Sequence, residues 1–71
     1  MNPIEASMED VVVQLSGDRR TLVVGHKGVS MVHDHRLCRD DALRTIESAA
    51  DLRGWLERNY ARVIASIAET K

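Results

Sequence analysis

The sequence predicts an α+β fold, with a three-stranded antiparallel β-meander followed by two α-helices that pack on one face of the sheet. Two observations support this prediction. Valine and other β-branched residues dominate the segments 11–15 and 21–24, and such side chains favour extended strands. From residue 40 onward, apolar side chains recur at the three- and four-residue spacing of a helix. The order of these patterns predicts a sheet covered by a helical layer.

Size and composition are typical of one globular domain. The chain has 71 residues, and we expect a single domain over residues 9–71. Residues 1–8 contain Pro3 and are expected to form a flexible N-terminal tail. The single cysteine, Cys38, excludes an intrachain disulfide and favours a reducing, cytoplasmic location. The longest apolar runs have three residues, whereas a membrane helix needs about 20.

Three consecutive strands are expected. The first two cover residues 11–15 and 21–24, and Ser16-Gly17-Asp18 supplies the turn between them. Gly25-His26-Lys27-Gly28 contributes two glycines that can adopt positive φ, which indicates a second reversal. The third strand is then expected over residues 29–37.

Two helices should follow the sheet. Asp40 is placed to cap the first, whose apolar stripe lies within residues 42–50. Ser48 and Asp51 have the spacing of a capping box and mark the start of the second. Gly54 in the second helix is expected to make room for a strand or for the first helix. The sequence leaves open whether the two helices are separate or form one kinked helix. The second helix has the clearest pattern, one apolar stripe made of Leu52, Trp55, Leu56, Tyr60, Val63, Ile64 and Ile67.

The strands carry more apolar side chains than one helical layer is expected to cover. The runs 11–13 and 22–24 are entirely apolar, and neighbouring residues of a strand point to opposite faces. Some of these side chains should therefore face away from the helices. We expect a second copy of the chain to cover them, so that the protein acts as a homodimer through the sheet or its edge.

One group of side chains has the chemistry of a metal site. His33 and His35 share a face of the expected third strand, Cys38 follows in the turn, and His26 lies in the preceding loop. Imidazole and thiolate are ligands that zinc prefers. The spacing is not that of a common zinc motif, and partly solvated histidines beside a buried cysteine are the alternative interpretation. We therefore expect no cofactor, with zinc as the alternative.

No catalytic residue is assigned. A cysteine beside a histidine can form a nucleophile, and Cys38 follows His35 by three residues. However, the sequence offers no evident oxyanion site, and a domain of this size has little volume for a pocket of about 300 Å³. We do not expect an enzyme.

Nucleic-acid binding by a β-ribbon is a further alternative. The basic residues that could support it are Arg19, Arg20, Lys27, Arg36 and Arg39. Acidic residues are interleaved among them, and the formal net charge is −1, so the electrostatic term that dominates such binding is weak. We expect a solvated surface here.

The second helix is the first choice for contact with a foreign protein, although most of its stripe is expected to be core. Trp, Tyr and Arg are enriched at interface hot spots. The candidate partner-binding residues are Arg53, Trp55, Arg58, Tyr60 and Arg62.

The chain contains the segments Cys38-Arg39-Asp40-Asp41-Ala42-Leu43 and Leu56-Glu57-Arg58-Asn59-Tyr60-Ala61-Arg62-Val63-Ile64. They resemble a family of small proteobacterial and phage proteins called domain of unknown function 1488. The resemblance covers roughly residues 28–68 and implies strands followed by helices. It transfers no site residues, because the family has no established activity. The expected function is that of a small non-enzymatic protein-interaction module, a bacterial or phage regulator, inhibitor or assembly partner.

Overall fold

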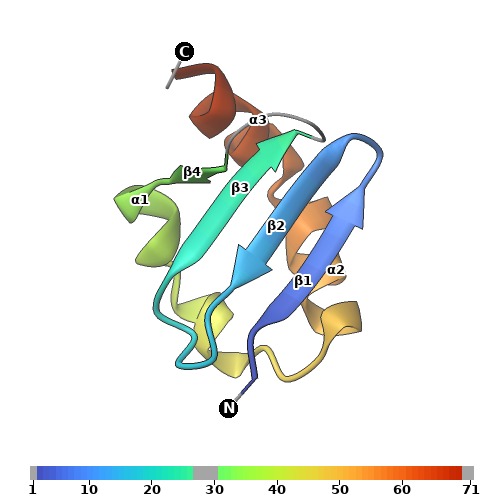
Figure 1. Cartoon of the computed structure of the whole chain (residues 1–71), viewed down its shortest axis with the longest axis vertical. Coiled ribbons are helices and arrows are strands. Elements are labelled where there is room, and N and C mark those ends of the chain that lie inside the picture. The colour runs from blue at the N-terminus through green and yellow to red at the C-terminus, as the bar shows by residue number, and fades with distance from the viewer. Residues whose placement is uncertain (1, 27–30, 70–71) are drawn as a thin grey trace.

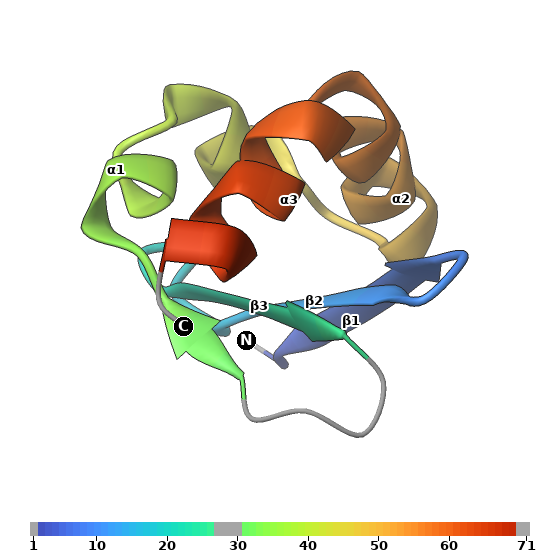
Figure 2. The ribbon, with the colours of Figure 1, turned by 90° about the horizontal axis from the view of Figure 1, so that it is seen from above.

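A computed structural model describes residues 2–26 and 31–69 of the chain as two layers, a sheet and a group of helices (Figure 1). Four strands form one antiparallel sheet in the order β1-β2-β3-β4. They are β1 (Ile4–Met8), β2 (Val11–Leu15), β3 (Leu22–His26) and β4 (Val32–His33). Figure 2 shows the helices on one face of this sheet. The predicted α+β class is confirmed, but the sheet has four strands where three were expected.

The extra strand is β1, which corrects the expectation of a flexible tail over residues 1–8. Its residues alternate between apolar and polar, and Ile4, Ala6 and Met8 are half-buried against the core. This period of two is the signature of a strand with one covered face. Pro3 stands just before the strand, where a missing backbone N–H does not interrupt the ladder.

A two-residue turn joins β1 to β2. Met8 lies opposite Val11, which leaves only Glu9 and Asp10 between the strands, and Glu9 adopts a φ of 54°. Tight hairpin turns require such positive φ values. β1 therefore folds back on β2 as a local hairpin.

The central strands β2 and β3 match the predicted first two strands, and they place nearly all of their large apolar side chains on the helical side. The fully buried ones are Val11, Val13, Leu15, Leu22 and Val24. Of the valines in these two strands, only Val12 and Val23 occupy the opposite face, and both are half-buried. The outer face is therefore less apolar than the sequence suggested, because register places the large side chains of both strands on one side.

The expected third strand over residues 29–37 is shorter than predicted. Within the described residues it is β4, which pairs Val32 with Val24 of β3. Asp34 ends it, because its carboxylate accepts a hydrogen bond from the Arg36 backbone N–H at 2.8 Å and so caps α1 (His35–Cys38). The predicted reversal is wrong at Gly25 and His26, which belong to β3 and pair with Val12 and Val11. Its Lys27-Gly28 part lies outside the described residues.

Three further helical segments follow: a 3₁₀ turn η1 (Asp41–Thr45), α2 (Ala49–Arg58) and α3 (Tyr60–Glu69). The predicted caps are confirmed. Asp40 Oδ1 accepts from the Ala42 N–H at 3.0 Å, and Ser48 Oγ accepts from the Asp51 N–H at 3.2 Å. The expected first helix is limited to the short η1, because the backbone becomes extended at Ile46. Ser48 then caps the start of α2.

The single stripe predicted for the second helix is divided between α2 and α3. Asn59 caps the end of α2, where its backbone N–H and its side-chain Nδ2 both donate to the Trp55 carbonyl, at 3.0 Å and 2.9 Å. Its own carbonyl accepts from the Val63 N–H at 3.0 Å. Asn59 thus satisfies the backbone on both sides of the break. No helix among the described residues has the length and apolarity needed to span a membrane.

Candidate functional site

The proposed metal ligands do not come together as one group. Cys38 is buried, with 6% of its surface exposed, and its Sγ accepts from the Leu22 backbone N–H at 3.2 Å. His33 lies on β4, His35 begins α1 and His26 ends β3. Within residues 2–26 and 31–69, no three His, Cys, Asp or Glu side chains are placed to hold a metal ion. Cys38 thus packs as a small core residue against the start of β3.

The two histidines of this group are neighbours. The ring centroids of His33 and His35 are 4.6 Å apart in an edge-to-face arrangement. His33 sits on the outer face of the sheet, opposite Val23, and both histidines are exposed. They form one end of a polar surface that lies between α1 and α3.

The candidate partner-binding residues are divided between core and surface. Trp55 is only 1% exposed and belongs to the core, and Tyr60 is half-buried beside it. Arg53 is exposed and pairs with Glu57 at 3.5 Å, a contact that lies along α2. Arg58 is also exposed and lines a depression of about 340 Å³. Trp55 and Arg62 both join a network with another element, through Asp40.

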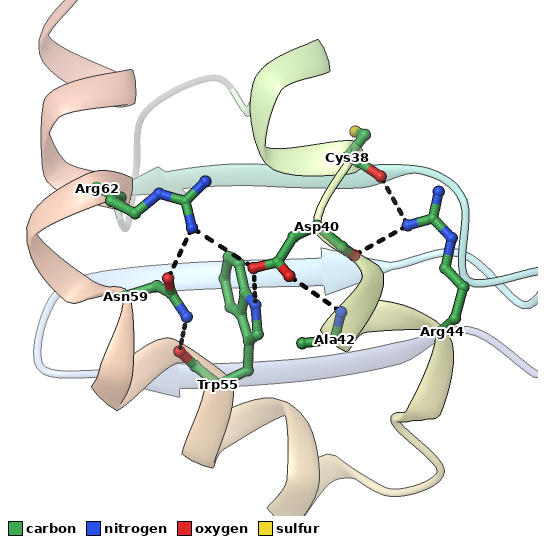
Figure 3. A network of polar contacts seen from close by, with 7 residues as sticks. All are labelled: Cys38, Asp40, Ala42, Arg44, Trp55, Asn59 and Arg62. Carbon is green, nitrogen blue, oxygen red and sulfur yellow. Dashed lines mark hydrogen bonds and ion pairs between the residues drawn. The ribbon is translucent and has the colours of Figure 1, made fainter.

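That network centres on Asp40 (Figure 3). Asp40 Oδ2 accepts from the Trp55 indole Nε1 at 3.0 Å and lies 3.5 Å from the guanidinium of Arg62. Arg62 in turn donates to Asn59 Oδ1 at 2.9 Å. Arg44 completes the group by donating to the carbonyl of Asp40 at 3.1 Å and to that of Cys38 at 2.7 Å. One carboxylate thereby links the cap of η1 to α2 and α3.

The pKa of Asp40 reflects these contacts. Burial alone would raise the pKa of the carboxyl, but the Ala42 N–H, the Trp55 indole and Arg62 all favour the charged form, and the pKa ends below its ordinary value. Asp40 is therefore ionised at neutral pH. Sequence reasoning assigned Asp40 only to capping, and Trp55 to the apolar stripe and to the candidate partner-binding residues. The 15-residue separation between Asp40 and Trp55 hides their contact.

Arg19 is a buried cation that the sequence analysis placed on the surface. Only 6% of it is exposed, and its guanidinium donates to four carbonyls: Ile46 at 2.7 Å, Asn2 at 3.1 Å, Gly17 at 3.1 Å and Ser16 at 3.2 Å. It binds three segments of the chain together. Arg19 is therefore not placed to contact a nucleic acid.

A concave polar surface lies between α1 and α3, and we call it the α1–α3 surface. One depression of about 200 Å³ is lined by Asp34, Arg36, Leu37, Arg62, Ala65, Ser66 and Glu69. An adjoining depression of about 370 Å³ adds His33 and His35 and shares Asp34, Arg36, Ser66 and Glu69 with the first. The two depressions therefore form one continuous concavity from the histidine pair to Arg62.

Asp34 is the fixed centre of the α1–α3 surface. Its Oδ2 accepts from Ser66 Oγ at 2.7 Å and from Arg36 at 3.2 Å, so it ties α1 to α3. Arg36 also pairs with Glu69 near the end of α3. The Ser66 hydroxyl first, and then Arg36, lower the pKa of Asp34 from 3.8 to about 2. Asp34 and Glu69 in turn raise the pKa of Arg36.

The site predicted from the sequence and the site found in the structure overlap only in part. Arg62, His33 and His35 were predicted and lie on the α1–α3 surface. Asp34 and Ser66 were not singled out as partners, because 32 residues separate them and no local pattern signals a contact across that distance. The available sequence signal for this contact was a polar residue, Ser66, within an apolar helical stretch.

The class of protein defined by this fold and site is a small two-layer α+β domain with a polar concave surface. Comparisons with family models, with curated proteins and with solved structures find no match to this chain.

Proposed function

We propose that this chain is a small non-enzymatic protein-interaction module, serving as a regulator, inhibitor or assembly partner, and that its α1–α3 surface binds the partner protein. The observation that carries the proposal is the continuous concavity between α1 and α3, with two exposed guanidiniums along it. The exposed fractions of the Arg36 and Arg62 side chains are 69% and 53%. Both are therefore accessible to another molecule.

Preorganisation makes these two arginines suitable contacts. Arg36 donates to Asp34 through Nε at 3.3 Å and through a terminal nitrogen at 3.2 Å, and Arg62 is held by Asn59 and Asp40. A side chain that is already ordered loses less conformational entropy when a partner binds. Arginine is also among the residues enriched at hot spots.

The state of the reactive side chains supports a binding role. The Cys38 thiol makes two contacts with the backbone of Leu22. Its Sγ accepts a hydrogen bond from the Leu22 N–H at 3.2 Å and donates one to the Leu22 carbonyl at 3.6 Å. Asp40 and Asp34 serve as helix caps and as links between elements. Cys38, Asp40 and Asp34 therefore have structural roles that account for their positions.

A matched pair of double variants tests the proposal. The variant Arg36→Ala with Arg62→Ala removes both guanidiniums of the α1–α3 surface, and the control Arg53→Ala with Arg58→Ala makes the same charge change on α2. Each tagged variant is used to capture proteins from the source cell, with folding checked by circular dichroism. We expect a protein retained by the wild type and by the α2 control to be lost from the α1–α3 variant. Loss from the α2 control alone would move the partner surface to α2.

Metal binding has one specific observation in its favour, the 4.6 Å contact between His33 and His35. A zinc titration followed by calorimetry would test it. A site built on this pair would lose zinc in His35→Ala and keep it in Cys38→Ser, because Cys38 is buried against Leu22. The opposite result would show that the cysteine leaves the core to bind the metal.

A further inference from the structure

The free edge of the sheet at β1 is open to a further strand. Among residues 2–26 and 31–69, β1 is the outermost strand of the order β1-β2-β3-β4, and it pairs with β2 on one side only. It has five residues, with no proline or lysine among them. Natural edge strands are usually protected by such residues, by a bulge or by shortness, and β4 at the other edge has two residues. The one charged side chain of β1 is Glu5, and the strand has neither proline nor lysine and is longer than β4.

Hairpin geometry shows which backbone groups face that edge. In a hairpin with a two-residue turn, the residues that flank the turn exchange ladder hydrogen bonds, and hydrogen-bonded pairs then alternate along the strands. Met8, Ala6 and Ile4 therefore direct their backbone groups toward β2. The N–H and C=O groups of Glu5 and Ser7 point to the free edge, where another strand can pair with them.

The side chains of β1 suit a second copy of the same strand. Ile4, Ala6 and Met8 lie on the helical side and remain half-buried, so their outer edges lack cover. A strand added beside β1 with the same alternation would bring its own apolar residues against them. A twofold axis perpendicular to the sheet generates such an antiparallel pair from two identical strands.

Charge selects one register for that pair. A twofold axis through Glu5 would place two glutamates directly opposite each other, and an axis through Ser7 would place Glu5 opposite Glu9. Like charges directly opposite in a sheet are destabilising. An axis through Ala6 places Glu5 opposite Ser7 on the outer face, and on the helical side it places Ile4 opposite Met8 and Ala6 opposite itself. This register pairs the edge-facing backbone groups of Glu5 and Ser7 without any like-charge pair.

We infer that two copies of this chain associate through antiparallel pairing of β1 with β1, centred on Ala6, to form one continuous eight-stranded sheet with both helical layers on the same side. The inference takes up the homodimer expected from the sequence, and it names the interface. It leaves the α1–α3 surface free, because that surface lies beside β4 at the far end of the strand order. Pairing through two short strands covers less area than a standard interface, so we expect association in the micromolar range.

Ser7 gives a test that depends on the register. In this dimer each Ser7 lies opposite Glu5 of the second copy, so Ser7→Lys creates two attractive pairs and Ser7→Glu creates two repulsive ones. Sedimentation velocity from about 1 to 200 µM should show dissociation constants about threefold lower for Ser7→Lys and about threefold higher for Ser7→Glu than for the wild type. Glu5→Lys combined with Ser7→Glu should lower the dissociation constant about threefold relative to the wild type, as Ser7→Lys does, because opposite charges then face each other with their positions exchanged.

Thr21 supplies the matched controls, because it is exposed at the β2–β3 turn and away from β1. Thr21→Lys and Thr21→Glu make the same changes of net charge and should leave association unchanged. A chain that stays monomeric up to about 200 µM would overturn the inference. A dimer that responds alike to Ser7→Lys and Ser7→Glu would overturn it too.

A cysteine at the symmetry axis gives an independent readout. Ala6→Cys should form a disulfide-linked dimer under mild oxidation, because the two positions face each other across the axis. Ile4→Cys should not, because Ile4 faces Met8. Equal cross-linking of both variants would contradict the register. The partner-capture experiment uses other residues, so its failure and a failure here are distinguishable.

Discussion

Arg19 occupies a place where three segments of the chain meet. Its guanidinium donates to carbonyls in the N-terminal segment, in the β2–β3 turn and in the extended link between η1 and α2. No carboxylate accepts from it among the hydrogen bonds described; backbone dipoles compensate the buried charge instead. Its backbone adopts a φ of 64°, which positions the side chain within the turn. Specific buried polar contacts of this kind help to fix one arrangement of the elements.

Replacing Arg19 should therefore destabilise the fold strongly. Arg19→Met keeps most of the side-chain volume but leaves the Ile46 carbonyl without its donor, and we expect a loss of about 2–4 kcal/mol in the free energy of unfolding. Urea denaturation followed by circular dichroism measures it. The control is Arg20→Met, since Arg20 is exposed, and it should change the free energy by less than about 0.5 kcal/mol. Equal losses in both variants would contradict the role assigned to Arg19.

Asp34 should give stability a pH dependence in the acid range. Its pKa is lowered to about 2 in the fold from 3.8, so the ionised form stabilises the folded state above about pH 4. This contribution falls as the pH drops from about 4 to about 2, where the folded state also takes up the proton. The hydrogen bond from Ser66 is the largest cause of the lowered pKa, and solvent screens the contact with the exposed Arg36, so we expect Asp34 to contribute only about 1 kcal/mol.

Asp34→Asn tests this prediction, because asparagine still caps a helix but carries no charge. The wild type should be more stable than this variant at pH 6, by about 1 kcal/mol, and the difference should shrink toward zero near pH 2. Asp41→Asn is the control, at an exposed position. A stability difference that does not vary with pH would mean that hydrogen bonding, rather than charge, accounts for the effect.

At the scale of elements, helix ends are set by short polar side chains. Asp34, Asp40 and Ser48 each accept from a backbone N–H at the start of a helical segment. Asn59 closes α2 and accepts from the first turn of α3. Asp40, Ser48 and Asn59 divide what looks like two helical stripes into η1, α2 and α3, and Asp34 starts α1 within the expected third strand. The breaks let α3 cross β3 while α2 packs on β1, as Figure 2 shows.

Gly54 in α2 does not have the role expected from the sequence. The nearest atom to an added Cβ is the Arg58 guanidinium nitrogen at 3.4 Å, which belongs to a flexible side chain of the same helix. Neither a strand nor η1 needs the space. Gly54→Ala should therefore stabilise the protein by about 0.5–1 kcal/mol through helix propensity. Thermal unfolding would show a higher midpoint, and a lower midpoint would mean that the depression beside Gly54 requires the glycine.

At the scale of the whole molecule, the sheet and helical layer share one core. It combines Val13, Leu15 and Val24 from the strands with Leu43, Trp55 and Leu56 from the helical side, and all six are at most 1% exposed. β1 contributes three half-buried apolar residues and packs against α2. The N-terminal segment is therefore part of the domain, and the domain extends beyond the expected residues 9–71.

Removal of residues 1–8 should abolish cooperative folding. The truncated chain would lose β1, expose the edge of β2 and uncover the side of α2 that packs on β1. The control is Glu5→Ala with Ser7→Ala, which keeps the strand backbone and its apolar side chains. Circular dichroism and urea titration should show a folded control and no cooperative transition in the truncated chain. A cooperative transition of normal midpoint would restore the interpretation of these residues as a tail.

The sequence by itself determined the α+β class, the two central strands and the caps at Asp40 and Ser48, because alternation, helical spacing and capping are local patterns. β1 could also have been predicted from the sequence, since Ile4, Ala6 and Met8 alternate with polar residues. Only the tertiary structure decided that the large strand side chains share one face, that Arg19 is buried, and that Asp34 meets Ser66. These outcomes depend on strand register and on contacts between distant segments, and neither can be predicted from the spacing of neighbouring residues.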